Sequence, residues 1–305
     1  MGHTKQRMDI HQEVKMVLKE KERFGESKYA AKLNGTAKDG IYSYSTARVY
    51  NRECQKFAEY VKQNSPTGRY TSLKDALGYA KEYIAEHNAD MTKSPYTVKL
   101  ERSALAKLYG VDATELGDVR DRSREAITRS REKTVISEKT GKEIKNPKTC
   151  AGRFSERNHP NEVAFARGTG MRRSEMESVR GDQLKQRPDG SYYFKMDGSQ
   201  CKGGREREIP VKGDVDRIKE LCENAGSERV FDKIPGHMDV HSFRSEYATN
   251  LYKELARERD EIPREDRYCC RNDLKGTWYD KRAMKEVSEA LGHSRISVIA
   301  EHYLR

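Results

Sequence analysis

The sequence predicts a mainly α-helical protein with a small β-hairpin, an α+β arrangement spread over more than one domain. Three observations carry this prediction. The 305 residues suffice for about two domains of roughly 150 residues each. Apolar residues recur at helical spacing through most of the chain. Two strand-like runs, at 192–194 and 208–211, stand around glycine-rich turns and are typical of a hairpin.

The composition points to a polyanionic partner. Lysine and arginine number 60 against 49 acidic residues, which gives a net charge of +11. Only 34% of residues are hydrophobic, compared with about 45–50% in an average globular protein. No run approaches the roughly 18 apolar residues of a membrane span, and the N-terminus lacks the apolar core of a signal peptide. The six cysteines form no C-x-x-C pair, so we expect no disulfide framework, no zinc knuckle and a reducing, cytoplasmic environment.

Residues 1–40 form a charged segment that we expect to be helical and separate from the domain that follows. One face of this segment is apolar and contains Ile10, Val14, Val17 and Leu18. Gly25 and the stretch 34–40 interrupt the helical pattern.

The apolar spacing and capping residues of 41–118 predict a small all-helical domain. The first helix runs near 45–63. The second opens at Ser72, whose side chain can cap free N–H groups while Asp75 reaches back. The third starts at Ser94-Pro95, a cap followed by a proline where no N–H is missed.

A basic linker is predicted at 119–157. Residues 120–157 contain twelve lysines and arginines against six acidic residues, a net charge of +6. A charged run is usually a solvated face, but this one joins two folded regions and has few apolar residues, which favours contact with phosphates. The residues expected to contact the DNA backbone are Arg120, Arg122, Arg124, Arg129, Arg131, Lys133 and Arg153.

The C-terminal region, 158–305, predicts helices on both sides of the hairpin. Helical spacing occurs around Val163, through Met176, near 213–224 and 241–257, and again around Met284. A polar stretch at about 256–280 contains Cys269, Cys270 and Trp278.

Five short motifs occur in this region in a fixed order. They read T-G-M-R-R-S-E at 169–175, C-K-G-G-R-E-R-E-I-P-V at 201–211, H-S-F-R at 241–244, L-G-H-S at 291–294 and H-Y at 302–303. Each motif alone is a weak signal, because a lone histidine, arginine or tyrosine is usually structural. Five motifs in register are far more specific.

The motif set resembles that of the tyrosine recombinase (phage integrase) family, which includes the Xer, Cre and lambda-integrase type enzymes, over residues 158–303. The resemblance implies a helical core-binding domain and a catalytic domain that together form a clamp around DNA. It also implies a set of catalytic residues, namely Arg172, Lys202, His241, Arg244, His293 and the nucleophile Tyr303, with Glu175 supporting Arg172. Arg173 adjoins Arg172, so the register of the first arginine rests on the T-G-x-R pattern, and His302 is taken as a neighbour of the nucleophile.

The implied activity is site-specific recombination of double-stranded DNA. In this family the tyrosine attacks a phosphodiester, two arginines hold the phosphoryl oxygens, and a 3′-phosphotyrosine preserves the bond energy for rejoining. The resemblance implies no cofactor, neither metal nor ATP. It implies a homo-oligomer, with a tetramer in the synapse, accessory DNA-bending or directionality factors, and a nucleoid-associated location. The expanded 256–280 segment and the linker favour an integrase of a mobile element over a housekeeping resolvase.

Two other classes remain open at this stage. A non-catalytic, architectural DNA-binding protein would need no nucleophile, which speaks against it. A metal-dependent nuclease using His241 and His293 would require a carboxylate cluster beside them, and the sequence offers no dense one. Type IB topoisomerases share the chemistry, but the motifs here are closer to those of recombinases.

Overall fold

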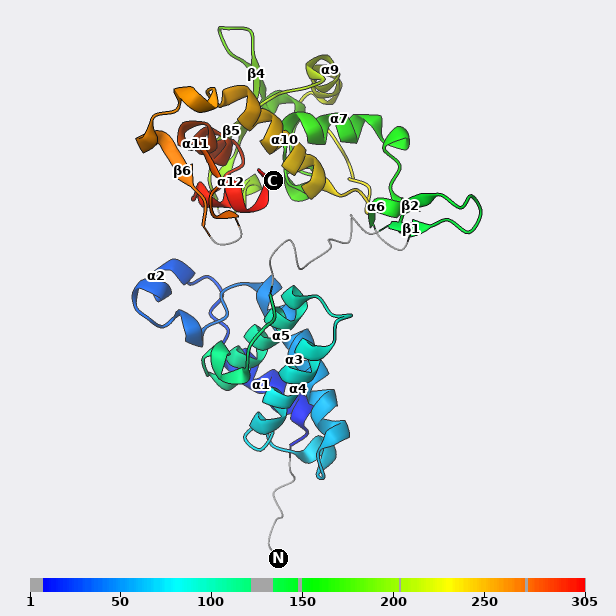
Figure 1. Cartoon of the computed structure of the whole chain (residues 1–305), viewed down its shortest axis with the longest axis vertical. Coiled ribbons are helices and arrows are strands. Elements are labelled where there is room, and N and C mark those ends of the chain that lie inside the picture. Colours follow the sequence, from blue (N-terminus) through cyan, green and yellow to red (C-terminus); the bar gives the residue numbers. More distant parts are fainter. Residues whose placement is uncertain (1–7, 122–133, 148–149, 203, 272–273, 305) are drawn as a thin grey trace, which may run out of the picture. The chain divides into compact units, whose positions relative to one another are not determined.

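The structure is a computed structural model that describes residues 8–121, 134–147, 150–202, 204–271 and 274–304. The chain forms two compact units, residues 1–127 and 128–305, which Figure 1 draws in blue through cyan to blue-green and in green to red. The described elements confirm the mainly α-helical class with small antiparallel sheets. Among the described residues, none of the helices combines the length and the apolar character that crossing a bilayer requires.

The N-terminal unit is helical. Its helices are α1 (Ile10–Glu20), α2 (Lys28–Leu33), α3 (Tyr44–Asn64), α4 (Leu77–Ala89) and α5 (Pro95–Tyr109). The long helix α3 packs against α1, α4 and α5. Ile10 and Val14 of α1 are fully buried in the same core as Phe57 of α3 and Ile84 of α4. The charged segment expected to stand apart from residues 41–118 is therefore in part continuous with their core.

Of the two capping residues read from the sequence, Ser94 marks a helix start and Ser72 does not. Ser94 accepts a hydrogen bond from the Tyr96 N–H at 3.2 Å, and Pro95 occupies the first turn of α5. The Asp75 N–H donates to Ser72 Oγ at 3.2 Å. Residues 73–76 form a turn, however, so α4 begins at Leu77 rather than at the predicted Ser72.

Part of the predicted linker is a β-hairpin. Strands β1 (Thr134–Ile136) and β2 (Glu143–Lys145) pair antiparallel, and the short helix α6 (Cys150–Arg153) follows. The prediction of a plain linker missed these strands because each has three residues and a largely exposed surface, without a buried apolar face.

In the C-terminal unit, helices surround a small sheet. The sheet contains β3 (Leu184–Gln186), β4 (Tyr192–Met196) and β5 (Arg207–Pro210), all antiparallel and in that order. The helices are α7 (Pro160–Thr169), α8 (Arg173–Met176), α9 (Val215–Ala225), α10 (Val240–Leu255), α11 (Lys281–Ala290) and α12 (Ser297–His302). Helix α10 contacts both α7 and α11 (Figure 1). The predicted hairpin thus has a third strand, β3, and the helix predicted through Met176 is only one turn long.

The polar stretch at 256–280 contains two further strands. Strands β6 (Arg267–Cys269) and β7 (Trp278–Asp280) pair antiparallel, with Tyr268 opposite Tyr279. Strand β7 runs directly into α11, and Asp280 accepts a hydrogen bond from the Arg282 N–H at 3.0 Å as its N-cap. The stretch is therefore an ordered pair of strands that precedes a helix of the core.

Candidate active site

The turn after α7 places the first motif. Helix α7 ends at Gly170, whose φ of +58° lies in the left-handed region. A Cβ atom at Gly170 would lie 2.3 Å from the Tyr247 ring, so no larger residue fits beneath α10. Glycine therefore brings the Gly170 carbonyl oxygen within 2.6 Å of Arg244 Nη1.

Arg172 follows this turn and is held by a buried carboxylate. Glu175 has no exposed surface. Its carboxylate accepts hydrogen bonds from the Arg172 N–H at 2.8 Å and from Arg172 Nη1 at 2.9 Å. Burial alone would raise the pKa of Glu175, but the guanidiniums of Arg207 and Arg172 hold it below its usual value. Glu175 is therefore ionised and fixes the direction of the Arg172 side chain.

Arg173 lies in a different environment from its neighbour. Its guanidinium donates to the carbonyl oxygens of Ile234 and Pro235, at 2.9 and 3.0 Å, and to that of Met238 at 2.7 Å. It thus holds the chain before α10, whereas Arg172 faces Glu175.

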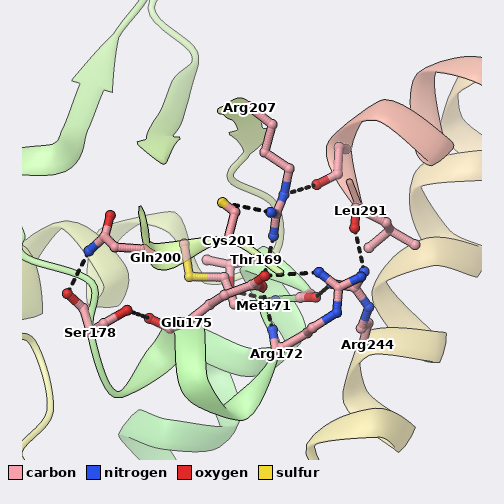
Figure 2. A network of polar contacts seen from close by, with 12 residues as sticks. Thr169, Met171, Arg172, Glu175, Ser178, Gln200, Cys201, Arg207, Arg244 and Leu291 are labelled. Carbon is pink, nitrogen blue, oxygen red and sulfur yellow. Dashed lines mark hydrogen bonds and ion pairs between the residues drawn. The ribbon is translucent and has the colours of Figure 1, made fainter. Parts of the chain in front are cut away.

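Arg207, on β5, belongs to the same network and was not selected from the sequence. Figure 2 shows its guanidinium between Glu175, Cys201 and the carbonyl oxygen before Leu291. Nη2 donates to Glu175 at 2.7 Å, Nη1 to Cys201 Sγ at 2.9 Å, and Nε to the Ala290 carbonyl at 3.0 Å. Arg207 therefore connects the segments that carry three of the motifs. The feature that could have indicated Arg207 is its position two residues before Ile209, because residues two apart on a strand lie on the same face and Ile209 is buried.

Arg244 lies at the centre of the site. It is 1% exposed and extends from α10 toward the end of α11 (Figure 2). Besides the Gly170 carbonyl, its guanidinium donates to the Leu291 carbonyl at 2.5 Å and, through Nε, to the Tyr303 hydroxyl at 3.2 Å. Burial lowers the pKa of Arg244, yet an arginine remains charged near neutral pH.

The end of α11 places the fourth motif. Gly292 has a φ of +67°, and a Cβ there would lie 3.1 Å from the Arg207 guanidinium. His293 follows, and its Nε2 lies 3.1 Å from the Tyr303 hydroxyl. Burial, together with the charges of Arg244 and Arg172, lowers the pKa of His293 to about 4. The imidazole is therefore neutral near pH 7 and can accept a proton.

Tyr303 follows α12 and is 8% exposed. Its hydroxyl lies between Arg244 Nε and His293 Nε2. His302, in contrast, is exposed, and its imidazole lies 3.9 Å from the Glu301 carboxylate.

His241 stands one helical turn before Arg244 on α10. It is exposed, and together with Arg172 and Arg244 it lines a pocket of about 610 Å³. Lys202 lies exposed in the loop between β4 and β5. The structure thus forms two directly hydrogen-bonded groups, Arg172 with Glu175 and Arg244 with His293 and Tyr303, and Arg172 and Arg244 line the same pocket. It places His241 on the rim of the pocket and Lys202 on the surface.

The basic residues predicted to contact DNA have different surroundings. Arg120 donates to the Asn88 carbonyl at 2.5 Å and also to the carbonyls of Asp90 and Lys93, so its guanidinium covers the turn between α4 and α5. Arg153 is exposed and donates to the Pro147 carbonyl at 3.2 Å. The others, Arg122, Arg124, Arg129, Arg131 and Lys133, lie outside the described residues.

The charge of the site suits an anion. Arg172 and Arg207 share one carboxylate, Glu175, and Arg244 adds a third guanidinium nearby, so the cluster has an excess of positive charge. In the part of the chain that the structure describes, no group of three His, Cys, Asp or Glu side chains is placed to hold a metal ion. Fixed guanidiniums beside a hydroxyl and a neutral imidazole can bind a phosphodiester and activate an attacking oxygen.

No family model and no curated protein matches the sequence. The chain is similar to solved structures of the Tn1549 transposon integrase. With transposon right-end DNA bound, that integrase has a TM-score of 0.46 and 13% identity, over 98% of this chain and 95% of the other. With circular intermediate DNA bound, the values are 0.48 and 12%, over 98% and 96%.

The chain is also similar to the XerA recombinase, with a TM-score of 0.29 and 12% identity over 97% of this chain and 94% of the other. Identities and TM-scores this low leave the function to be inferred from the site itself.

Proposed function

We propose that the chain is a tyrosine-type, site-specific DNA recombinase that cuts and rejoins strands through a 3′-phosphotyrosine intermediate. One observation carries the proposal: the Tyr303 hydroxyl lies 3.2 Å from Arg244 Nε and 3.1 Å from His293 Nε2. These residues come from three separate segments, and each belongs to one of the motifs that resemble those of tyrosine recombinases. A tyrosine used only for packing has no need of a buried arginine and a neutral histidine at its hydroxyl.

In the proposed cleavage step, Tyr303 Oη attacks the phosphorus of a DNA phosphodiester. A bond forms between the tyrosine oxygen and phosphorus, and the bond to the 5′ oxygen breaks. The transition state spreads negative charge over the two non-bridging oxygens, which Arg172 and Arg244 bind as fixed donors. Glu175 and Arg207 keep Arg172 in the orientation that this requires.

Two protons move in this step. Neutral His293 accepts the proton of the tyrosine hydroxyl through Nε2, and His241 on the pocket rim assists at the phosphoryl oxygens. Lys202 supplies the proton that the 5′-hydroxyl leaving group needs, a role carried over from the motif resemblance. Reversal of the step with a different 5′-hydroxyl rejoins the strands, so no external energy source is required.

The partner in this proposal is double-stranded DNA. The helical domain at 41–118 serves as the core-binding half of a clamp, the segment 119–157 as its basic linker, and 158–305 as the catalytic half. Arg122, Arg124, Arg129, Arg131 and Lys133 add to the positive charge of the linker. We also propose that the protein forms a homotetramer in the synapse and works with accessory DNA-bending or directionality factors. In this proposal it is cytoplasmic and nucleoid-associated, and it integrates or excises a mobile element.

The test is the detection of a covalent protein–DNA adduct on a denaturing gel. The protein is incubated in EDTA with nicked or supercoiled DNA from the source element, and Tyr303→Phe is the matched variant. We expect an adduct that disappears completely with Tyr303→Phe while DNA binding is retained. An adduct that persists in the variant would assign the nucleophile to another residue.

Two other outcomes separate the alternative classes. DNA cleavage that appears only with a divalent cation and leaves no adduct would indicate a nuclease. Binding that weakens steeply with salt, without any adduct, would indicate an architectural DNA-binding protein.

A further inference from the structure

The backbone around Tyr303 is held by side chains from elsewhere in the C-terminal unit. Thr249, on α10, donates from Oγ1 to the Tyr303 carbonyl at 3.1 Å. Tyr279, on β7, donates from its hydroxyl to the Leu304 carbonyl at 2.5 Å. Leu304 is 4% exposed, so its side chain is also fixed in the core. These contacts fall on the residue that carries the proposed nucleophile and on the next one.

The strand that carries Tyr279 is itself firmly attached. Asp280, the next residue, is fully buried and accepts two hydrogen bonds from the Arg257 guanidinium, both at 2.9 Å. This pairing holds the pKa of Asp280 well below its usual value. The Asp280 N–H donates to the Tyr252 hydroxyl at 2.8 Å, and the rings of Tyr252 and Tyr279 pack edge to face with centroids 5.6 Å apart. Strand β7 is thus joined to the end of α10 by charge, hydrogen bonding and ring packing.

This arrangement gives the 256–280 stretch a connection to the reaction. Asp280 caps α11, which ends at Ala290 just before the Leu291 carbonyl and His293, while Tyr279 holds the segment after α12. One short strand therefore contacts both the helix that precedes His293 and the segment that follows α12 and contains Tyr303. The position of a reacting group matters steeply, since a misplacement of about 1 Å can cost on the order of 10²-fold in rate.

We infer that the β6–β7 pair is an anchor for the nucleophile, with Tyr279 and Thr249 as positioning residues that hold Tyr303 against Arg244 and His293. The inference rests on the proposed role of Tyr303. Neither residue touches the DNA phosphate in this account. Both restrict where the Tyr303 hydroxyl can lie.

The test compares Tyr279→Phe with Tyr268→Phe. Both variants remove one hydroxyl from the same antiparallel pair, but only Tyr279 reaches the Leu304 carbonyl. We expect Tyr279→Phe to slow single-turnover adduct formation at saturating DNA about three- to tenfold, the effect of one neutral hydrogen bond. DNA affinity and melting temperature stay at the wild-type values. Adding Thr249→Val removes the second anchor and slows the step further.

Hydrogen exchange gives a readout that does not depend on DNA. The N–H groups of Tyr303 and Leu304 both donate to the Ile299 carbonyl, at 3.0 Å, so their exchange reports on this segment. Tyr279→Phe is expected to speed exchange in residues 297–304 alone, because a general loss of stability would speed it throughout the unit. Exchange and adduct formation equal to those of Tyr268→Phe would overturn the inference. If the wild-type protein forms no adduct, the proposed function fails, and exchange in 297–304 still decides whether Tyr279 holds this segment.

Discussion

The two units bury charge in opposite ways. In the N-terminal unit, Glu101 is 1% exposed and has two basic side chains as partners, with Lys93 Nζ at 3.7 Å and the imidazole Nδ1 of His87 at 2.8 Å. In the C-terminal unit, Arg244 is equally buried, but among the described residues its donors meet carbonyl oxygens, Tyr303 and His293 rather than a carboxylate.

A buried charge without a counter-ion costs free energy, and proteins rarely keep one without a use. The buried carboxylate of the N-terminal unit joins α5 to α4 and to the turn between them, which is a structural role. Among the residues that the structure describes, no carboxylate is hydrogen-bonded to the Arg244 guanidinium, which lies next to a hydroxyl and a pocket. We interpret it as a charge whose counter-ion is the phosphate of bound DNA. Perturbed ionisable groups of this kind concentrate at functional sites.

The largest effect is expected from Arg244→Lys. Lysine keeps the positive charge but lacks the planar fork that reaches Tyr303, Gly170 and Leu291 together. Adduct formation should fall by about 10²–10³-fold, as for the loss of one preorganised donor, while DNA affinity changes little. The rate is measured in single turnover with saturating DNA. If Arg244→Lys cleaved DNA at the wild-type rate, the functional role that separates the buried charge of Arg244 from that of Glu101 would be contradicted.

A smaller effect is expected from Arg207→Met, which acts through Glu175 and His293. Loss of the guanidinium releases one side of Glu175 and should slow adduct formation between about 10- and 100-fold through misplacement of Arg172. The pH profile adds a second readout. Because the pKa of His293 is lowered to about 4, neutral His293 persists down to that pH, and the acid limb of kcat/KM should lie near pH 4.

Arg207 is among the positive charges that lower the pKa of His293. Arg207→Met should therefore move the acid limb to higher pH, whereas Arg207→Lys keeps the charge and should leave the limb in place. An unchanged limb in Arg207→Met, with slow cleavage, would mean that Arg207 acts only on Glu175.

The smallest effect on the reaction is expected from Glu101→Gln. The neutral amide weakens the pairing with His87 and Lys93, which should lower the free energy of unfolding by about 1–2 kcal/mol. The rate of adduct formation at saturating DNA should not change. Thermal unfolding and single-turnover cleavage measure the two quantities on the same sample. A large loss of cleavage by a folded Glu101→Gln would show that the N-terminal unit contributes more than DNA binding.

The helices were largely predictable from the sequence, and the short strands were not. Helix α3, predicted near 45–63, runs over Tyr44–Asn64, because its apolar residues repeat at helical spacing from Val49 to Val61 and Ser43 caps its start. Strands β1, β3 and β6 have three residues each, too few for an alternation of apolar and polar side chains to stand out. Each of them pairs with the next strand along the chain.

The candidate site was predictable where residue type and chemistry coincide. Arg172, Arg244, His293 and Tyr303 were selected by motif, and the structure places them around one pocket and one hydroxyl. Arg207 was overlooked because its role depends on a buried carboxylate 32 positions away. Arg120 shows the opposite case, since composition cannot distinguish an arginine that faces solvent from one that covers backbone carbonyls.

The most direct test of the central claim is to identify the residue that carries the DNA in the covalent adduct. After trypsin and nuclease digestion of the trapped adduct, mass spectrometry would locate the residual nucleotide. We predict a 3′-phosphotyrosine at Tyr303 in the peptide 296–305, because only this hydroxyl lies between Arg244 and His293 among the described tyrosines. A nucleotide on any other residue, or an adduct that forms without modification of this peptide, would contradict the account.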